Sequence, residues 1–99
     1  MISGQVEIVS TNPALPSNNV SSLTVTLSRE LTSRERTNFQ ARITHLNNGA
    51  VVVYNLYSGK VMRTGVPDTE VGSYTISGNV VTVSFDQPTS ISTFQLTNP

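Results

Sequence analysis

The side chains that could do chemistry are few and scattered along this 99-residue chain. His45 is the only histidine and there is no cysteine, so a transition-metal site would need several carboxylates gathered around one imidazole. The sequence contains no cluster with such a spacing. We expect His45 to be a packed, half-buried residue on the apolar face of a strand.

The carboxylates and hydroxyls form no recognisable reactive set either. Asp68 and Glu70 share a predicted loop and could assist a calcium ion, but two carboxylates fall short of the roughly six to eight oxygens that calcium takes. No serine lies in a nucleophile elbow, and no glycine-rich phosphate loop occurs. Asn19-Val20-Ser21 is a formal glycosylation triplet of a kind that is common by chance. We therefore predict a non-enzymatic protein without catalytic residues, metal or cofactor.

Composition indicates one small β-rich domain that spans residues 1–99. Ser, Thr, Val and Asn are abundant, which favours strands and turns over helices. The net charge is zero and 12% of residues are charged, which argues against a nucleic-acid partner, because such a partner needs clustered Lys and Arg. Residues 1–10 lack the features of a signal peptide and no stretch has the length of a membrane span, so we expect no membrane partner.

The clearest structural signal is a hairpin over residues 71–85, with the sequence VGSYTISGNVVTVSF. Gly78-Asn79 favours a two-residue turn of the primed type. Counting outward from this turn places Tyr74 opposite Val83 and separates an apolar face from a face of Ser and Thr. A slip by one residue would mix the two faces, so the pattern determines the register.

A second hairpin is predicted over residues 39–57 around Asn48-Gly49, the strongest short hairpin signal. One of its faces is apolar apart from His45, and the other is polar except near the turn. The apolar residues at that tip are Leu46, Val51 and Val53. The tip indicates either a contact surface or a patch covered by a loop or by the terminus.

The remaining segments complete an antiparallel β-sandwich of about seven strands. Further strands are expected at 5–10, 20–28, 61–62 and 91–96, with loops at 12–19 and 63–70 and turns at 58–60 and 86–89. Residues 32–35, TSRE, fit a capping box and predict one short helical turn near residues 32–37. Helices do not alternate with the strands, so a parallel α/β sheet is not expected.

Three segments share the order and pattern of a known family. They are VEIVSTNPA at 6–14, LTVTLSREL at 23–31 followed by TNF at 37–39, and YTISGNVVTVSF at 74–85. Together they resemble the bacterial immunoglobulin-like domains of surface-layer and adhesin proteins. The resemblance implies an immunoglobulin-like sandwich that serves as a spacer, an adhesion module or, as on bacteriophage virions, a capsid decoration. The chain departs from the family in its longer middle and at Asp86, where the family tends to have proline.

These observations favour a structural protein, a virion accessory (capsid cement or decoration) protein that binds and bridges coat subunits on the capsid surface. The expected partner-contact residues are Arg34, Arg36, Leu46, Val51, Val53 and Tyr57, because aromatic and arginine anchors and apolar patches dominate interfaces. The plainer interpretation of the charged segment 29–38 is a solvated connector. Self-association into a homo-oligomer stays open.

The alternative is an immunoglobulin-like adhesin or carbohydrate-binding module from a longer bacterial surface or phage tail protein, which would act at the bacterial cell surface. Sugar platforms present exposed aromatic rings, and this chain has no tryptophan and three tyrosines, which counts against that alternative.

Overall fold

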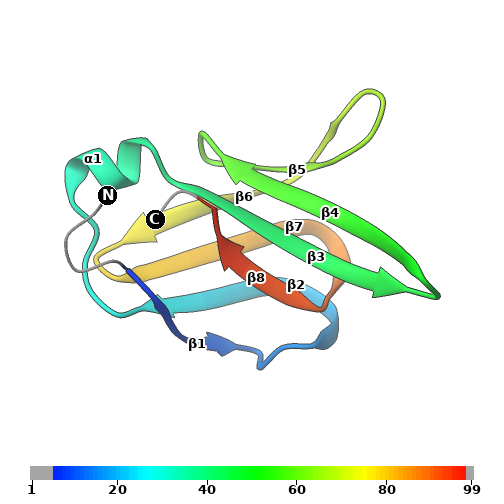
Figure 1. The fold of residues 1–99 in the computed structure, drawn as a ribbon, viewed down its shortest axis with the longest axis horizontal. Helices are drawn as coiled ribbons and strands as arrows, with labels where there is room; N and C mark the ends of the chain where they lie inside the picture. Colours follow the sequence, from blue (N-terminus) through cyan, green and yellow to red (C-terminus); the bar gives the residue numbers. More distant parts are fainter. Residues whose placement is uncertain (1–5, 98–99) are drawn as a thin grey trace.

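The computed structural model describes residues 6–97 and shows an all-β protein with one short helix (Figure 1). Within this part of the chain, eight antiparallel strands form one sheet in the order β1-β2-β7-β6-β5-β4-β3-β8. The elements are β1 (Ile8–Asn12), β2 (Ser17–Leu27), α1 (Ser33–Thr37), β3 (Gln40–Asn47), β4 (Ala50–Tyr57), β5 (Lys60–Arg63), β6 (Thr69–Ser77), β7 (Val80–Ile91) and β8 (Thr93–Leu96). The sheet coils until it is nearly barrel-shaped, with β1 and β8 at its two edges. The prediction of an all-β, antiparallel chain with one helical turn is confirmed.

Both predicted hairpins are present, with every predicted cross-strand pair in place. The β6–β7 hairpin pairs Tyr74 with Val83, and the β3–β4 hairpin follows the count outward from its own turn. The φ angles of Gly78, Asn48 and Gly49 are 60°, 50° and 85°, which is the left-handed backbone of primed turns. Turn type and strand alternation therefore act together to determine both registers.

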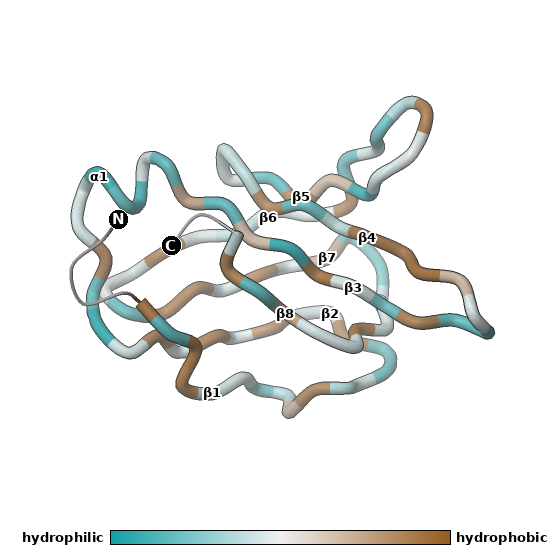
Figure 2. Tube along the Cα trace, viewed as in Figure 1, coloured by the Kyte–Doolittle hydropathy of each residue, from teal (hydrophilic) through white to brown (hydrophobic). Residues whose placement is uncertain are grey.

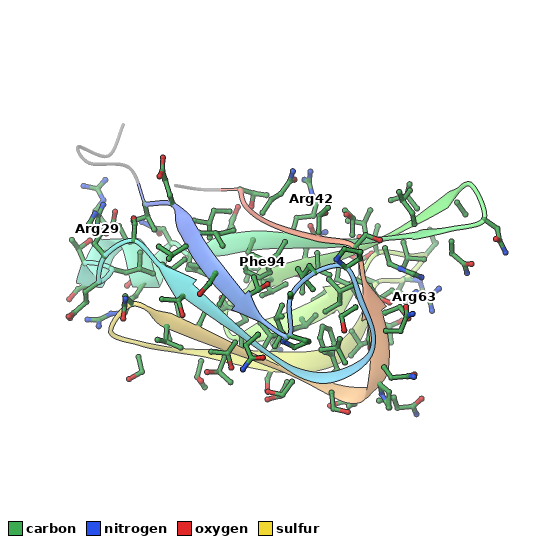
Figure 3. All side chains as sticks on the ribbon, turned by 90° about the horizontal axis from the view of Figure 1, so that it is seen from below. Arg29, Arg42, Arg63 and Phe94 are labelled. Atoms are coloured by element: carbon green, nitrogen blue, oxygen red, sulfur yellow. The ribbon has the colours of Figure 1, made fainter. Side chains whose placement is uncertain are left out.

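The core fills the interior of the coiled sheet with alternate residues of the strands. On β2, Leu23, Val25 and Leu27 are buried while the threonines between them face outward. Figure 2 shows apolar positions recurring along the strands, as this alternation requires. Figure 3 shows Phe94 of β8 among the interior side chains, whereas Arg42 of β3 lies at the periphery. Because each strand buries one face and exposes the other, the outward positions are free to form contact surfaces.

The N-terminal strand boundaries differ from the prediction. The first strand was expected at 5–10, but β1 starts at Ile8, and residue 5 lies outside the described residues. The loop expected at 12–19 is shorter, since β2 begins at Ser17, which pairs with Ile91 of β7. The ladder between β2 and β7 extends back to Ser17, directly after Pro16, and this long-range pairing is not encoded by the local sequence.

The predicted turn at 86–89 is wrong, because β7 runs through it as one strand. Val20 of β2 pairs with Thr89 whereas Ser22 pairs with Ser84, so β7 has extra residues at this point. The extra residues form a bulge that contains Pro88, a residue unable to donate a ladder hydrogen bond. The last predicted strand also shortens, because residue 91 belongs to β7 and β8 starts at residue 93.

Candidate functional site

Arg34 and Arg36 lie on α1, at one end of the molecule (Figure 1). The helix begins after Thr32, whose hydroxyl accepts a hydrogen bond from the backbone N–H of Glu35 at 3.1 Å. The Glu35 carboxylate accepts the backbone N–H of Thr32 at 2.8 Å, so the predicted capping box is confirmed. Both arginines are exposed, and their side chains extend from a turn whose backbone is held by these caps.

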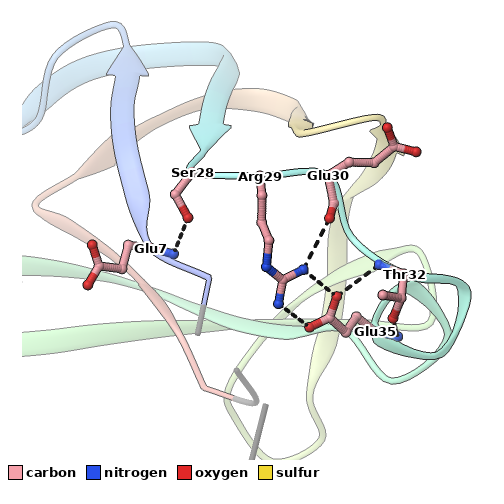
Figure 4. A network of polar contacts seen from close by, with 6 residues as sticks. All are labelled: Glu7, Ser28, Arg29, Glu30, Thr32 and Glu35. Atoms are coloured by element: carbon pink, nitrogen blue, oxygen red, sulfur yellow. Dashed lines mark hydrogen bonds and ion pairs between the residues drawn. The ribbon is translucent and has the colours of Figure 1, made fainter. Parts of the chain in front are cut away.

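A guanidinium from the preceding segment stabilises the same turn (Figure 4). Arg29 donates two hydrogen bonds of 2.8 Å to the two carboxylate oxygens of Glu35. The hydrogen bond from Arg29, followed by the one from the Thr32 backbone, lowers the pKa of Glu35 from 4.5 to about 2. Glu35 is therefore a structural carboxylate, and it orients the turn that presents Arg34 and Arg36.

Glu35→Gln is expected to cost stability at neutral pH, and that cost should shrink as the pH falls from about 4.5 towards 2. The carboxylate binds a proton less readily in the folded chain than in the unfolded chain. Its contribution is therefore present above the unfolded pKa and is lost as the pH falls through the folded pKa. Urea unfolding of both proteins across this pH range measures the difference. Glu30→Gln is the control, since the Glu30 side chain is exposed and forms no hydrogen bond within residues 6–97. A cost for Glu35→Gln that does not change with pH would contradict this role.

The apolar tip lies at the opposite end of the molecule, on a projecting ribbon of two strands (Figure 1). We call residues 45–53 the arm. On its outer face Leu46 is 64% exposed and Val51 is 55% exposed, while Val53 is half-buried nearer the body. His45 lies half-buried on the inner face, as predicted, and its Nδ1 is enclosed without a hydrogen-bond partner among the described residues. Of the two alternatives for the tip, cover by a loop or by the terminus is not found within the described part of the chain.

Tyr57 lies at the far end of β4 from the arm, beside an open hollow on the outer face of the β3–β4 hairpin. Tyr57 is 36% exposed and its strand partner is Gln40. The hollow has a volume of about 400 Å³. It is lined by Gln40, Ala41, Arg42, Asn55, Leu56, Tyr57, Asp68 and Thr97. An aromatic ring, a guanidinium, a carboxylate and two amides thus border one shallow space.

The six predicted contact residues therefore occupy three places. The arginines and the arm lie at the two ends of the molecule's longest dimension, which is 38 Å (Figure 1). The sequence contained a signal for the separation of the arginines from the arm, because β3 runs from the end of α1 to the arm. An eight-residue strand spans about 27 Å at about 3.4 Å per residue, so α1 and the tip of β3 cannot lie together.

Two features of this surface were missed by the sequence analysis. Val66 is fully exposed in the loop between β5 and β6, where the Gly65 N–H donates to the Asp68 carboxylate at 2.8 Å. A second open hollow, of about 360 Å³, lies beside the β7 bulge. It is lined by Tyr54, Arg63, Glu70, Val71, Asp86, Gln87, Pro88 and Thr89. The bulge forms part of its wall, so predicting a turn there concealed it.

The two carboxylates considered for calcium do not converge. Asp68 lines the hollow beside Tyr57, whereas Glu70 lines the other hollow and lies 3.9 Å from the Lys60 ammonium. Residues 6–97 contain no group of three or more His, Cys, Asp or Glu side chains placed to hold a metal ion. None of their helices is long and apolar enough to cross a membrane.

Comparison of the chain with protein-family models, with curated proteins and with solved structures returned no match.

Proposed function

We propose that this chain is a non-enzymatic structural protein that bridges protein subunits, most specifically a virion accessory protein of the capsid cement or decoration type. The observation that carries the proposal is the presence of two exposed candidate contact surfaces at opposite ends of one small, well-packed body. A molecule built in this way can contact two neighbours at once and add buried area to the joint between them. The resemblance to immunoglobulin-like domains, which also serve as decorations and spacers, supports this proposal.

The two ends offer different kinds of contact. Arg34 and Arg36 present two guanidinium groups that suit carboxylates on a partner, and arginines are frequent interface anchors. Leu46 and Val51 present aliphatic side chains that gain from burial, at about 25 cal/mol per Å² of apolar surface removed from water. One end therefore contributes charge-assisted hydrogen bonds and the other end apolar contact.

The proposal is tested on particles purified from the source of the protein. Quantitative intact mass spectrometry should find the chain in a fixed copy number relative to the major coat protein. Particles stripped of the chain should rebind the recombinant protein, and an Arg34→Glu, Arg36→Glu variant should rebind at least tenfold more weakly, since two buried charge-assisted contacts are lost. The matched control is Arg63→Glu, because Arg63 lies far from α1 and is exposed. Absence of the chain from all particles would overturn the proposal.

The hollow beside Tyr57 favours one second candidate, a carbohydrate-binding module. An exposed ring can stack against a sugar, while the Arg42, Asn55 and Asp68 side chains can exchange hydrogen bonds with its hydroxyls. A glycan array tests this alternative. Binding that is lost in Tyr57→Ala and retained in Gln95→Ala, on the neighbouring strand β8, would favour the module over the virion protein.

A further inference from the structure

The arm receives little support from the strands on either side of it. The neighbour on one side, β8, pairs with β3 only as far as Thr44, and β5 pairs with β4 only from Tyr54 onward. Two further contacts hold the base of the arm, from the Ser92 hydroxyl to the Leu46 N–H at 3.0 Å and from the Thr64 N–H to the Val53 carbonyl at 2.9 Å. Beyond these contacts, the backbone hydrogen bonds of the arm with residues 6–97 are those between its own two strands.

The outer-face side chains at the tip of the arm, and part of its backbone, lack cover among residues 6–97. Leu46 and Val51 are more than half exposed on one face. In the β3–β4 ladder, residues 50 and 52 direct their backbone groups towards β3, so the N–H and C=O of Val51 face outward along a free edge. An isolated two-stranded ribbon is marginal in water, and an uncovered strand edge is a template for pairing.

The composition of the arm suits pairing with an identical arm. Residues 44–53, THLNNGAVVV, contain no Asp, Glu, Lys or Arg, so two copies can approach without repulsion between like charges. Strands that face each other across a twofold axis run antiparallel, so the edge of β4 can pair with its own copy. Val51 then lies opposite Val51 of the second copy, and the two apolar patches become continuous. The arm also projects past the body at one end of the molecule, where a second copy can approach it (Figure 1).

We propose that the arm is a homodimerisation element, in which the β4 edges of two copies pair antiparallel and bring their exposed Val51 side chains together, with Leu46 one strand away on the same face. The inference names the partner of one contact surface of the proposed function and rests on that function for its biological setting. In that setting the arginine ends contact coat subunits, and the arms join copies bound to neighbouring subunits.

The dimer should be weak in dilute solution. A stable interface buries about 800 Å² per partner, and a ribbon of nine residues supplies only part of that area. Copies held side by side on one particle, however, meet at an effective concentration of the order of millimolar, where a weak contact is populated. A weak joint of this kind assembles on the particle without causing aggregation of the free protein.

Sedimentation velocity over a concentration series up to the millimolar range tests the pairing. The wild-type protein should shift reversibly from monomer to dimer, and a Leu46→Lys, Val51→Lys variant should stay monomeric, because the lysines at position 51 would face each other in the pair and those at position 46 would add to the positive charge on the same face. The control is Val9→Lys, since Val9 on β1 is also 64% exposed and lies outside the arm. The control should dimerise like the wild type, and an unchanged unfolding transition shows that each variant is folded.

Disulfide cross-linking locates the contact. Because the chain has no cysteine, any disulfide that forms must involve the introduced residue. A single Val51→Cys variant should form a disulfide-linked dimer on mild oxidation, much faster than a single Val9→Cys variant. A wild-type protein that remains monomeric at the highest concentration would overturn the inference. Equal dimerisation of the wild type and the double lysine variant would overturn it as well. Dimerisation through the arm with no chain found on virions would leave the inference intact and remove the virion function.

Discussion

Truncation of Leu23 to alanine is expected to lower the free energy of unfolding by about 3 to 4 kcal/mol. Leu23 is fully buried on β2 and pairs with Val83 of β7. In the sheet, β1 lies beyond β2 and β6 lies beyond β7, so this pairing connects the two parts of the sheet. The change removes buried methyl groups and leaves a cavity, because β2 and β7 are held by their ladder and cannot collapse into the space. The free energy of unfolding of a domain of this size is about 5 to 15 kcal/mol, so the variant should lose a large part of its stability.

Urea unfolding followed by circular dichroism measures this loss. Thr24→Ala is the matched control, because Thr24 is the next residue on the same strand and faces outward. Thr24→Ala should lower the free energy of unfolding by about 1 kcal/mol or less, because the strand propensities of different residues span about that range. Equal costs for the two substitutions would mean that β2 presents the opposite face to the core, and the register of β2 against β7 would then be wrong.

The hairpins could be predicted from the sequence because their determinants are local. Asn48-Gly49 and Gly78-Asn79 each combine a turn that requires left-handed backbone with strands that alternate on both sides. The capping box that starts α1 is equally local, since its two hydrogen bonds join residues three apart. In each case one short segment contains all the atoms that determine the structure.

The order of strands in the sheet could not be predicted in this way. β2 pairs with β7, and β3 pairs with β8, which are contacts between distant segments. The composition of a strand does not determine which other strand pairs with its edge. The continuation of β7 through residues 86–89 depends on β2, which lies beside it. A proline and an acidic residue there have the properties of a turn, but the bulge accommodates both without ending the strand.

The candidate site was predictable in its residue types and not in its arrangement. Exposed Leu46 and Val51 follow from the register of their hairpin, and the arginines follow from the helical turn. The hollow beside Tyr57 depends on Asp68, which reaches β4 through a loop from β5 to β6. The conformation of that loop arises from the packing of the sheet and has no signature in the spacing of the sequence.

Replacement of Gly72 by alanine is expected to destabilise the fold by about 2 to 3 kcal/mol, the upper end of the range for overpacking. Gly72 is buried on β6, where it pairs with Phe85 of β7 and with Val61 of β5. An added Cβ would overlap the Ser84 carbonyl oxygen and would lie 3.1 Å from the Phe85 Cα. These are backbone atoms, so a rotation of a side chain cannot relieve the overlap.

Relief of the overlap requires β6 and β7 to separate at this point, which weakens their hydrogen bonds and loosens the packing of the Phe85 ring. Chemical unfolding measures the cost, and hydrogen exchange should show faster exchange of the β6 and β7 amides near position 72 than elsewhere in the sheet. Ser73→Ala is the control, because Ser73 is adjacent, exposed and outward-facing, and its cost should stay within about 0.5 kcal/mol. A glycine in a strand interior has no side chain to pack and often marks a bulge or a close approach of backbones, and Gly72 has both, since Val71 is an extra residue in the pairing of β6 with β5. If Gly72→Ala costs no more than Ser73→Ala, the two strands do not approach as closely as described, and the pairing of Gly72 with Phe85 is wrong.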